Sequence, residues 1–458
     1  MERDLTTGSV FKTVIYFSLP YLLSYFLQTL YGMADLFIVG QFGGVSSTTA
    51  VSVGSQIMHM LTVMIVGLAM GTTVSIAQAV GAGEHRRASQ STGNTVTMFM
   101  TISVVLMAVL LIFVKPIVSM MSTPAEAVDG TVQYLVICFI GIPFITAYNI
   151  ISSIFRGMGD SKSPMYFIAV ACFANIVLDY VFIGLFGLGP VGAALGTTVS
   201  QAISVIVSLA VIIKRRSIEL RKDDFRPKAA VMGKLLSIGV PVAFQDGLIQ
   251  ISFIIITIIA NRRGLNDAAA VGIVEKIMSF LFLIPSSMLS TVSALGAQNI
   301  GANKPERAVA TLRYAIMISV SIELIISVLI QLGAENIVAL FTDSQTDGGR
   351  EVIRLGGQYL RGYIWDSVFA GIHFSFSGYF CANGRSGLSF LHNILAIVLV
   401  RVPGAYLMSK MFPATLFPMG LATAAGSLLS VLICVIAFAI LQRKAKGVDL
   451  KSGSGATM

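Results

Sequence analysis

Long apolar segments, each of about 20 residues or more, are the feature that most constrains this fold. A helix of about 20 residues spans about 30 Å, which is the thickness of a bilayer's hydrocarbon core. Hydrophobic residues make up 55% of the 458-residue chain and charged residues only 12%, whereas soluble proteins are about 25% charged. The apolar segments also lack the period-two alternation of outer-membrane barrel strands. We therefore predict an all-α polytopic membrane protein.

Twelve candidate spans follow from the apolar segments, and all are interpreted as helices because open strands leave backbone groups unsatisfied in lipid. The stretch from residue 335 to residue 349 mixes apolar and polar residues, so we expect it near the membrane interface. The predicted spans are residues 14–40, 50–81, 91–114, 131–155, 164–186, 191–213, 235–260, 269–300, 308–332, 362–382, 387–409 and 415–441.

The basic residues predict the orientation of these spans. The two termini and the even-numbered loops carry 21 of the 31 lysines and arginines, and the odd-numbered loops carry 7. Short basic loops stay in the cytoplasm, so we expect both termini inside the plasma (inner) membrane of a bacterium. The most basic loop, residues 214–234, is predicted to be a cytoplasmic linker that touches anionic headgroups. It accounts for much of the net charge of +9 without any binding of nucleic acid.

Residues of the kinds that carry catalysis are scattered. The four histidines form no metal-ligand pattern, and no loop is long enough for a nucleotide-binding domain. A membrane enzyme would need a clustered nucleophile, metal ligands or a cofactor motif, so we predict that the chain is not an enzyme and holds no resident cofactor. The cysteines lie in or beside apolar stretches without CxxC spacing and are interpreted as small buried hydrophobic residues: Cys138, Cys172, Cys381 and Cys434.

The two halves of the chain repeat each other. The segment AQAVGAGEHRRA (77–88) matches AQNIGANKPERA (297–308), and FRGMGDS (155–161) matches FCANGRS (380–386). Two single positions add to the alignment, because Pro20 corresponds to Pro241 and Gly192 to Gly420. The offsets run from 220 to 228 residues in the same order along the chain. Six spans have therefore been duplicated, and an even number of spans makes the copies parallel.

This duplication predicts the domain organisation. We expect an N-lobe of six spans at residues 1–213, the linker at 214–234, a C-lobe of six spans at 235–443 and a cytoplasmic tail at 444–458. Two such bundles around a central cavity, open alternately to each side, form the geometry of a transporter.

Several segments carry a family resemblance that covers nearly the whole chain. YGMADLFIVGQFGG (31–44), the paired AQxxGA motifs, FRGMGDSKSP (155–164) and NIVLDYVFIGLFGLGPVGAALGT (175–197) resemble the MATE family of multidrug and toxic compound extrusion transporters. The resemblance is closer to the DinF-like branch than to the NorM-like branch. It implies a twelve-helix, two-lobed MATE/MOP-type fold and an antiporter that works by alternating access. Such an antiporter exports amphipathic organic cations or related compounds in exchange for H⁺ or Na⁺.

Two other classes of transport protein are alternatives to this interpretation. A lipid-linked oligosaccharide flippase of the same superfamily is the main alternative, but it is expected to have a strongly cationic cavity. The intramembrane charges of the N-half are acids, which favours cationic cargo. A channel suits two pseudo-symmetric bundles less well than alternating access does. We expect small-molecule substrates, the lipid bilayer as surroundings and a monomeric protein.

Two intramembrane acids single out one site. An ionised residue at mid-span costs at least about 2.5–3.5 kcal/mol on insertion scales. Asp179 and Thr197 each lie nine residues from Leu188 at the centre of a short outer hairpin, and Asp35 lies six to nine residues from the outer end of its span. At about 1.5 Å per residue, all three sit roughly 10–13 Å deep. Asn175 is one helical turn from Asp179, on the same face.

These four side chains predict a hard-oxygen site. Two carboxylates, an amide and a hydroxyl at one depth could hold Na⁺, or the two carboxylates could share a proton. The carbonyl of Ala193 could complete the set, and Tyr31 could donate a hydrogen bond to Asp35. By resemblance, these positions coincide with the N-lobe cation site of the DinF-like branch. In the alternative interpretation the two acids cap polar contacts between helices, and Thr197 bonds its own helix backbone.

The C-lobe departs from the pattern of the NorM-like branch. That branch typically places acids in the seventh and tenth spans, where this chain has Leu248, Ile249 and Ala370. The departure moves the expected coupling site to the N-lobe. Asp246 and Asp366 are nevertheless close by in sequence, and we expect them to line the central cavity and attract cationic substrates.

Three further charged residues of the C-half lie in apolar segments. Glu275 adjoins Lys276, with which it could form a local ion pair. Glu323 in the ninth span and Arg401 in the eleventh have no partner that can be identified from the sequence.

Overall fold

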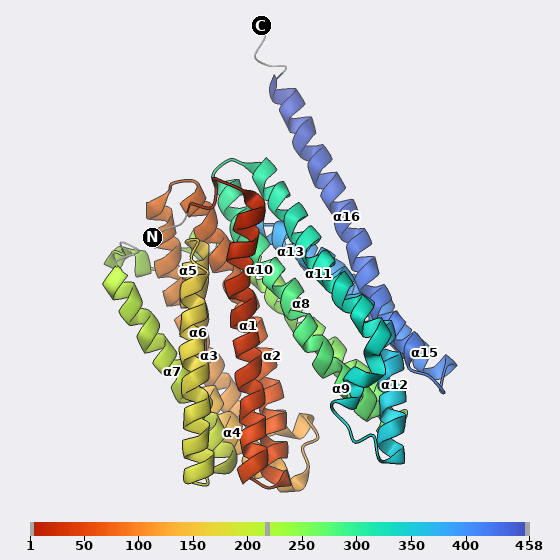
Figure 1. Ribbon diagram of the computed structural model, residues 1–458. Helices are drawn as coiled ribbons and strands as arrows, with labels where there is room; N and C mark the ends of the chain where they lie inside the picture. The colour runs from red at the N-terminus through yellow and green to blue at the C-terminus, as the bar shows by residue number, and fades with distance from the viewer. Residues whose placement is uncertain (1–3, 216–219, 454–458) are drawn as a thin grey trace. The chain divides into compact units, whose positions relative to one another are not determined.

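The computed structural model describes residues 4–215 and 220–453, and this described part contains helices and connecting loops but no strand (Figure 1). It divides into two compact units that do not follow chain order. Unit 1 comprises Met1–Gly247, Ser290–Tyr314 and Cys381–Gly384, and unit 2 comprises Leu248–Leu289, Ala315–Phe380 and Arg385–Met458. The expected division into lobes at residues 214–234 stays a prediction.

In the first half of the chain, the described residues 4–215 and 220–225 form seven α-helices, a π-helix that extends the sixth of them and a short 3-10 helix. Their bounds are α1 Val10–Phe42, α2 Val45–Gly81, α3 His85–Met120, α4 Ala125–Ile140, α5 Ile142–Gly157, α6 Lys162–Asp179, η1 Tyr180–Leu185, α7 Gly189–Arg215 and η2 Lys222–Phe225.

In the second half, the residues that the structure describes up to position 453 form nine α-helices and one π-helix. Their bounds are α8 Ala229–Asn261, α9 Leu265–Leu281, α10 Leu283–Gly301, α11 Pro305–Ala339, α12 Asp347–Tyr363, α13 Trp365–Ala382, α14 Ser386–Ala396, η3 Ile397–Arg401, α15 Val402–Met411 and α16 Phe417–Gly453. Helix α16 thus continues into the predicted C-terminal tail, of which residues 454–458 lie outside the described part.

The expected membrane spans are largely confirmed. Ten helical segments of the described chain are long and apolar enough to cross a membrane. The pair α4 and α5, bent by 47°, makes an eleventh. Gly141 separates the two, and Pro143 follows at the start of α5, where it has no amide hydrogen to continue the ladder of α4. The tenth expected span corresponds to α13, an 18-residue helix.

Unit 1 packs its helices around cores of aliphatic and aromatic side chains. Helix α6 lies beside α1 and α7, and α2 lies beside α4 and α5 (Figure 1). One core gathers Val39 of α1, Leu135 and Phe139 of α4 and Ala193 of α7, all buried. Because α1, α6 and α7 are neighbours, polar side chains on their facing surfaces can meet away from lipid.

Part of the predicted linker lies against α3. The Arg86 guanidinium forms an ion pair with Asp224 in η2 at 2.7 Å, and the Asp224 carboxylate is buried. The Asn94 amide donates to the Asp224 carbonyl at 2.9 Å, and the Lys228 backbone donates to the Asn94 side chain at 2.7 Å. The basic stretch is therefore partly structured within unit 1, which its charge alone did not indicate.

The repeated AQxxGA motifs contact each other reciprocally within unit 1. A Cβ atom added at Gly81 of α2 would lie 1.9 Å from the Gln298 carbonyl oxygen of α10. A Cβ atom added at Gly301 would lie 2.0 Å from the Gln78 carbonyl oxygen. Real Cβ atoms essentially never approach an oxygen closer than 3.0 Å, so only glycine allows the two helix ends to come this close.

Unit 2 is organised around α12 and α16. Helix α12 packs against α9 and α16, and α16 also contacts α14 and α15. Its core includes Tyr359 and Tyr363 of α12, which are fully buried, and Met419 of α16. Helix α11 runs past the expected end of the ninth span to Ala339 and has a kink at Gly333.

Candidate cation-binding site

Three helices of unit 1 bring together the four predicted oxygen-bearing side chains. Asp35 comes from α1, Asn175 and Asp179 from α6, and Thr197 from α7. The Thr197 hydroxyl donates a hydrogen bond to Asp35 Oδ2 at 3.1 Å. The Asp179 and Asn175 side chains are electrostatic neighbours of the Asp35 carboxyl. The depth argument from the sequence therefore identified residues that are neighbours in space.

Most of the oxygens at this site lack a donor. Asp35 is 3% exposed and Asp179 is fully buried. Asp35 Oδ1, both carboxylate oxygens of Asp179 and both polar atoms of the Asn175 amide have no hydrogen-bond partner among the described residues. No described lysine or arginine forms an ion pair with either carboxylate. Such a set fits a proton shared between the carboxyl groups, or a hard monovalent cation.

Gly196, directly before Thr197, is a site residue that the sequence analysis missed. A Cβ atom at this position would lie 2.0 Å from Asp179 Oδ1 and 3.6 Å from the Asn175 amide nitrogen. The missing side chain lets the backbone of α7 approach the carboxylate of α6. The only signal in the sequence was the run of small residues in PVGAALGT, which is equally typical of ordinary helix packing in membranes.

The end of α6 has an irregular backbone at the site. Asp179 is the last residue of α6, and the π-helix Tyr180–Leu185 continues directly from it. A π-helical turn shifts the side chains that follow it around the helix axis, and such turns are frequent at functional sites.

The two auxiliary groups, Ala193 and Tyr31, both stay predictions. Ala193 lies one turn before Thr197 and is buried in the apolar core, and its carbonyl as a ligand stays a prediction. Tyr31 of α1 and Asp35 are electrostatic neighbours, and a hydrogen bond from the Tyr31 hydroxyl to Asp35 stays a prediction.

The two predicted cavity acids lie in different units. Asp246 of α8 is partly buried in unit 1, and a Cβ atom at Gly67 of α2 would lie 2.8 Å from its Oδ2. Asp366 of α13 is fully buried in unit 2, with Arg401 Nη1 at 3.5 Å from its Oδ2. Their roles in attracting substrate stay predictions.

Arg401, for which the sequence indicated no partner, lies within a cluster in unit 2. Its Nη2 donates to the Tyr363 hydroxyl at 2.8 Å, and its guanidinium carbon lies 4.9 Å from the centre of the Phe253 ring. Glu275 is a further electrostatic neighbour of Arg401. The Thr257 hydroxyl donates to Glu275 Oε2 at 3.1 Å, so Glu275 has interactions beyond the expected local pairing with Lys276.

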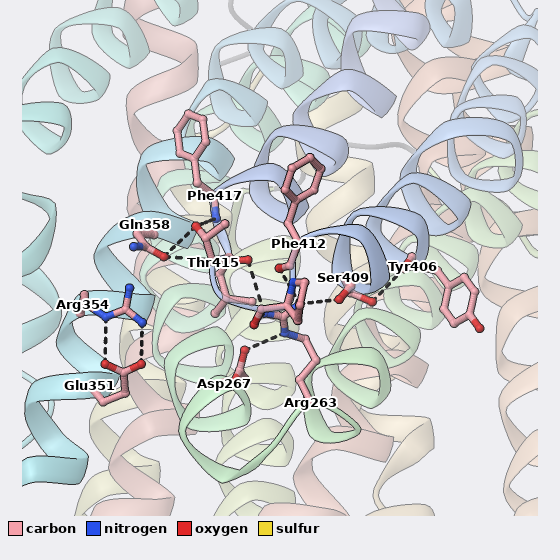
Figure 2. Close-up of polar contacts among 12 residues, drawn as sticks. Arg263, Asp267, Glu351, Arg354, Gln358, Tyr406, Ser409, Phe412, Thr415 and Phe417 are labelled. Carbon is pink, nitrogen blue, oxygen red and sulfur yellow. Dashed lines mark hydrogen bonds and ion pairs between the residues drawn. The ribbon is translucent and has the colours of Figure 1, made fainter.

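A second arginine of unit 2, Arg263, links the loop after α8 to the loop after α15 (Figure 2). Arg263, in the turn after α8, forms an ion pair with Asp267 at 2.7 Å. Its guanidinium also donates to the carbonyls of Ser409 at 2.6 Å and Pro413 at 2.8 Å. The loop between α15 and α16 is thus held to the loop between α8 and α9.

Figure 2 also shows an exposed pair on α12, where Arg354 lowers the pKa of Glu351 through its hydrogen bonds.

Comparison with known proteins places the chain in a family. The MatE family model matches residues 20–181 and 241–407. A relative named "Probable multidrug resistance protein YoeA" from Bacillus subtilis is 30% identical over 410 residues, covering 88% of this chain and 87% of the relative. "Probable multidrug resistance protein NorM" from Thermotoga maritima is 25% identical, covering 88% and 86%. These matches do not separate the DinF-like from the NorM-like branch, so the branch stays a prediction.

Solved structures show the same fold. An outward-facing multidrug resistance MATE family transporter of the MOP superfamily superposes with a TM-score of 0.89 at 22% identity. The superposition covers 96% of this chain and 99% of that structure. The expected MATE/MOP-type architecture is thereby confirmed.

Proposed function

Because this chain belongs to the MatE family of membrane transporters, we propose that it is a secondary active efflux antiporter. It exports amphipathic organic cations and related compounds and takes up H⁺ or Na⁺ in exchange. Relatives that span nearly the whole chain are named multidrug resistance or multidrug export proteins. These names support drug-like compounds as the substrate class. The buried acidic residues support a positive charge on the substrate.

The observation that carries the proposal is the pair of buried carboxylates, Asp35 and Asp179, which have no basic partner among the described residues. Two ionised carboxylates side by side in a membrane interior repel each other and lose their hydration. They are stable there only when a cation, either a proton or a metal ion, neutralises part of the charge. The oxygens without donors provide the ligands for that cation.

Antiport follows when this site and the substrate compete through the conformation of the protein. Asp35, Asp179 and Thr197 lie on three separate helices, so a bound cation draws α1, α6 and α7 together. A conformation in which these helices separate binds the cation more weakly. If substrate prefers that conformation, each ligand lowers the affinity of the other by the same factor.

The proposed orientation follows from the basic loops. The termini and the loop that contains Arg86 and Asp224 face the cytoplasm, and the hairpin at Leu188 faces outward. In this orientation the candidate site lies nearer to the outer surface, and the reciprocal AQxxGA contact lies at the cytoplasmic end. The protein acts as a monomer in a bacterial plasma membrane.

Flux measurements in proteoliposomes test the proposal. Purified protein is reconstituted with ethidium as the organic cation, and an H⁺ gradient or a Na⁺ gradient is imposed separately. Movement of ethidium against its own gradient, driven by one of the two ions and abolished by the matching ionophore, is the expected result. Ethidium movement that only follows its own gradient, whichever ion gradient is imposed, would contradict antiport and favour a channel or another cargo.

A further inference from the structure

The sequence repeat relates Arg401 to the candidate cation site. The repeated segments on either side of this region have offsets of 225 and 228 residues. Arg401 therefore corresponds to a position between Phe173 and Ile176 in the first half, a stretch that includes Asn175. Both helices also have a π-helical segment, Tyr180–Leu185 in the first half and Ile397–Arg401 in the second.

The Arg401 side chain is enclosed by groups that suit a cation. It is 7% exposed. Its guanidinium contacts the Asp366 carboxylate at 3.5 Å and the Tyr363 hydroxyl at 2.8 Å, and it lies 4.9 Å from the centre of the Phe253 ring. An acidic group combined with aromatic faces is the usual environment of a bound organic cation in a protein. Here the cation is part of the chain.

The two halves of the chain can be compared by their buried charges. In unit 1, Asp35 and Asp179 lie together, and among the described residues neither has a basic partner. In unit 2, Asp366 and Glu275 are both electrostatic neighbours of Arg401. A threonine hydroxyl donates to one acid in each pair, Thr197 to Asp35 at 3.1 Å and Thr257 to Glu275 at 3.1 Å. The main difference is that Arg401 supplies a positive charge to the acids of unit 2, whereas no described residue supplies one to the acids of unit 1.

We infer that Arg401 is a tethered cation, which fills in the second half the role that an exchangeable cation has in the first half. The inference rests on the proposed function, because it takes the unit 1 site as the one that binds and releases an ion. A guanidinium on a side chain cannot leave with the transported ion. Arg401 therefore offsets one of the two negative charges of Asp366 and Glu275 throughout the cycle, and its guanidinium occupies the place of a coupling ion while it is present.

Removal of the tethered charge should expose a new binding site. In Arg401→Ala, Asp366 and Glu275 lose their basic partner, and the space of the guanidinium becomes free. A soluble cation of matching shape can then take its place. Methylguanidinium reproduces the head of the arginine side chain, and Na⁺ tests whether a simple ion is sufficient.

Thermal melting of the purified protein, titrated with methylguanidinium or Na⁺, tests the inference. The experiment is made in an Asp35→Asn, Asp179→Asn background so that the unit 1 site does not respond, and potassium chloride controls for ionic strength. We expect a saturable rise in Tm for Arg401→Ala in this background and no rise for the background itself. The matched variant that also has Asp366→Asn should lose the rise, because the carboxylate that holds the cation is gone.

The possible outcomes separate this inference from the proposed function. A folded Arg401→Ala protein that responds to neither cation would overturn the tethered cation. If Arg401→Ala is recovered only when methylguanidinium is present, the inference is supported. If it cannot be recovered with or without that cation, while the variant with Asp366→Asn can be, the inference is wrong. If Na⁺ raises the Tm of the wild-type protein and of the Asp35→Asn, Asp179→Asn background equally, the result would instead contradict the proposed unit 1 site.

Discussion

The reciprocal contact between the AQxxGA motifs makes Gly81→Ala an informative substitution. The added methyl group would lie 1.9 Å from the Gln298 carbonyl oxygen, whereas 3.0 Å is the closest approach that real Cβ atoms tolerate. The backbones of α2 and α10 must therefore separate by about 1 Å. Neither atom can move aside by a rotamer change, because one is a Cβ and the other is backbone.

The expected cost is about 1–3 kcal/mol, the usual penalty for overpacking a well-packed contact. If this contact closes one end of the transporter, the same free energy raises the population open at that end by about 5- to 150-fold. Cys381 provides a native reporter, because it is fully buried and adjoins Ala382, whose carbonyl accepts a hydrogen bond from Gln78 at 2.8 Å. Its rate of labelling by a membrane-impermeant maleimide should rise by that factor when the other three cysteines are replaced.

Two controls make the result interpretable. Gly233→Ala on α8 has no atom within 4 Å of the added methyl group, so it should leave the labelling rate unchanged. Cys434 is fully buried in α16, and its labelling in a matched single-cysteine protein should not increase unless the protein unfolds. Unchanged labelling of Cys381 in Gly81→Ala, with an unchanged melting temperature, would refute the argument that glycine is required at this contact.

Four further substitutions test other features of the protein. Arg263→Gln should lower the free energy of unfolding by about 2–4 kcal/mol because it breaks a largely buried ion pair and leaves carbonyls without donors. The exposed Arg354→Gln should cost no more than about 0.5 kcal/mol, and equal losses in chemical unfolding would contradict this contrast. Gly196→Ala should abolish ion-driven efflux in proteoliposomes without changing any charge, since the methyl group displaces the Asp179 carboxylate; normal coupling would mean that the close approach is dispensable. Glu323→Gln removes a buried carboxylate whose oxygens have no hydrogen-bond donor among the described residues, so its Tm should equal or exceed that of the wild type, and a lower Tm would reveal a stabilising partner.

The candidate site could be predicted from the sequence because its residues lie at the same depth in the membrane. Asp179 and Thr197 are equidistant from the turn at Leu188, and helical rise converts that separation into depth in the membrane. Asp35 was placed by the same argument, from the outer end of its own span. The long apolar segments gave the helices themselves, since burial in lipid leaves few alternatives.

Contacts that depend on how helices are rotated against one another could not be predicted. The pairing of Arg401 with Asp366 joins α13 to the end of η3, and the sequence does not say which faces of two distant helices meet. The same holds for Gly196, whose importance comes from the approach of α7 to α6. The AQxxGA motifs were visible as a repeat, but their mutual contact required the structure.

The most direct test of the central claim is ion-driven efflux by Asp35→Asn, Asp179→Asn and the double variant, measured beside equilibrium substrate binding. Each substitution removes one charge and nearly preserves shape, so each should abolish driven efflux while the folded protein still binds substrate. The double variant should lose little more than either single one, because residues that act as a unit fail together. Asp246→Asn serves as the matched control and should retain coupling. Near-normal driven efflux in Asp35→Asn and Asp179→Asn, with coupling lost in Asp246→Asn, would contradict the assignment of the coupling site to α1, α6 and α7.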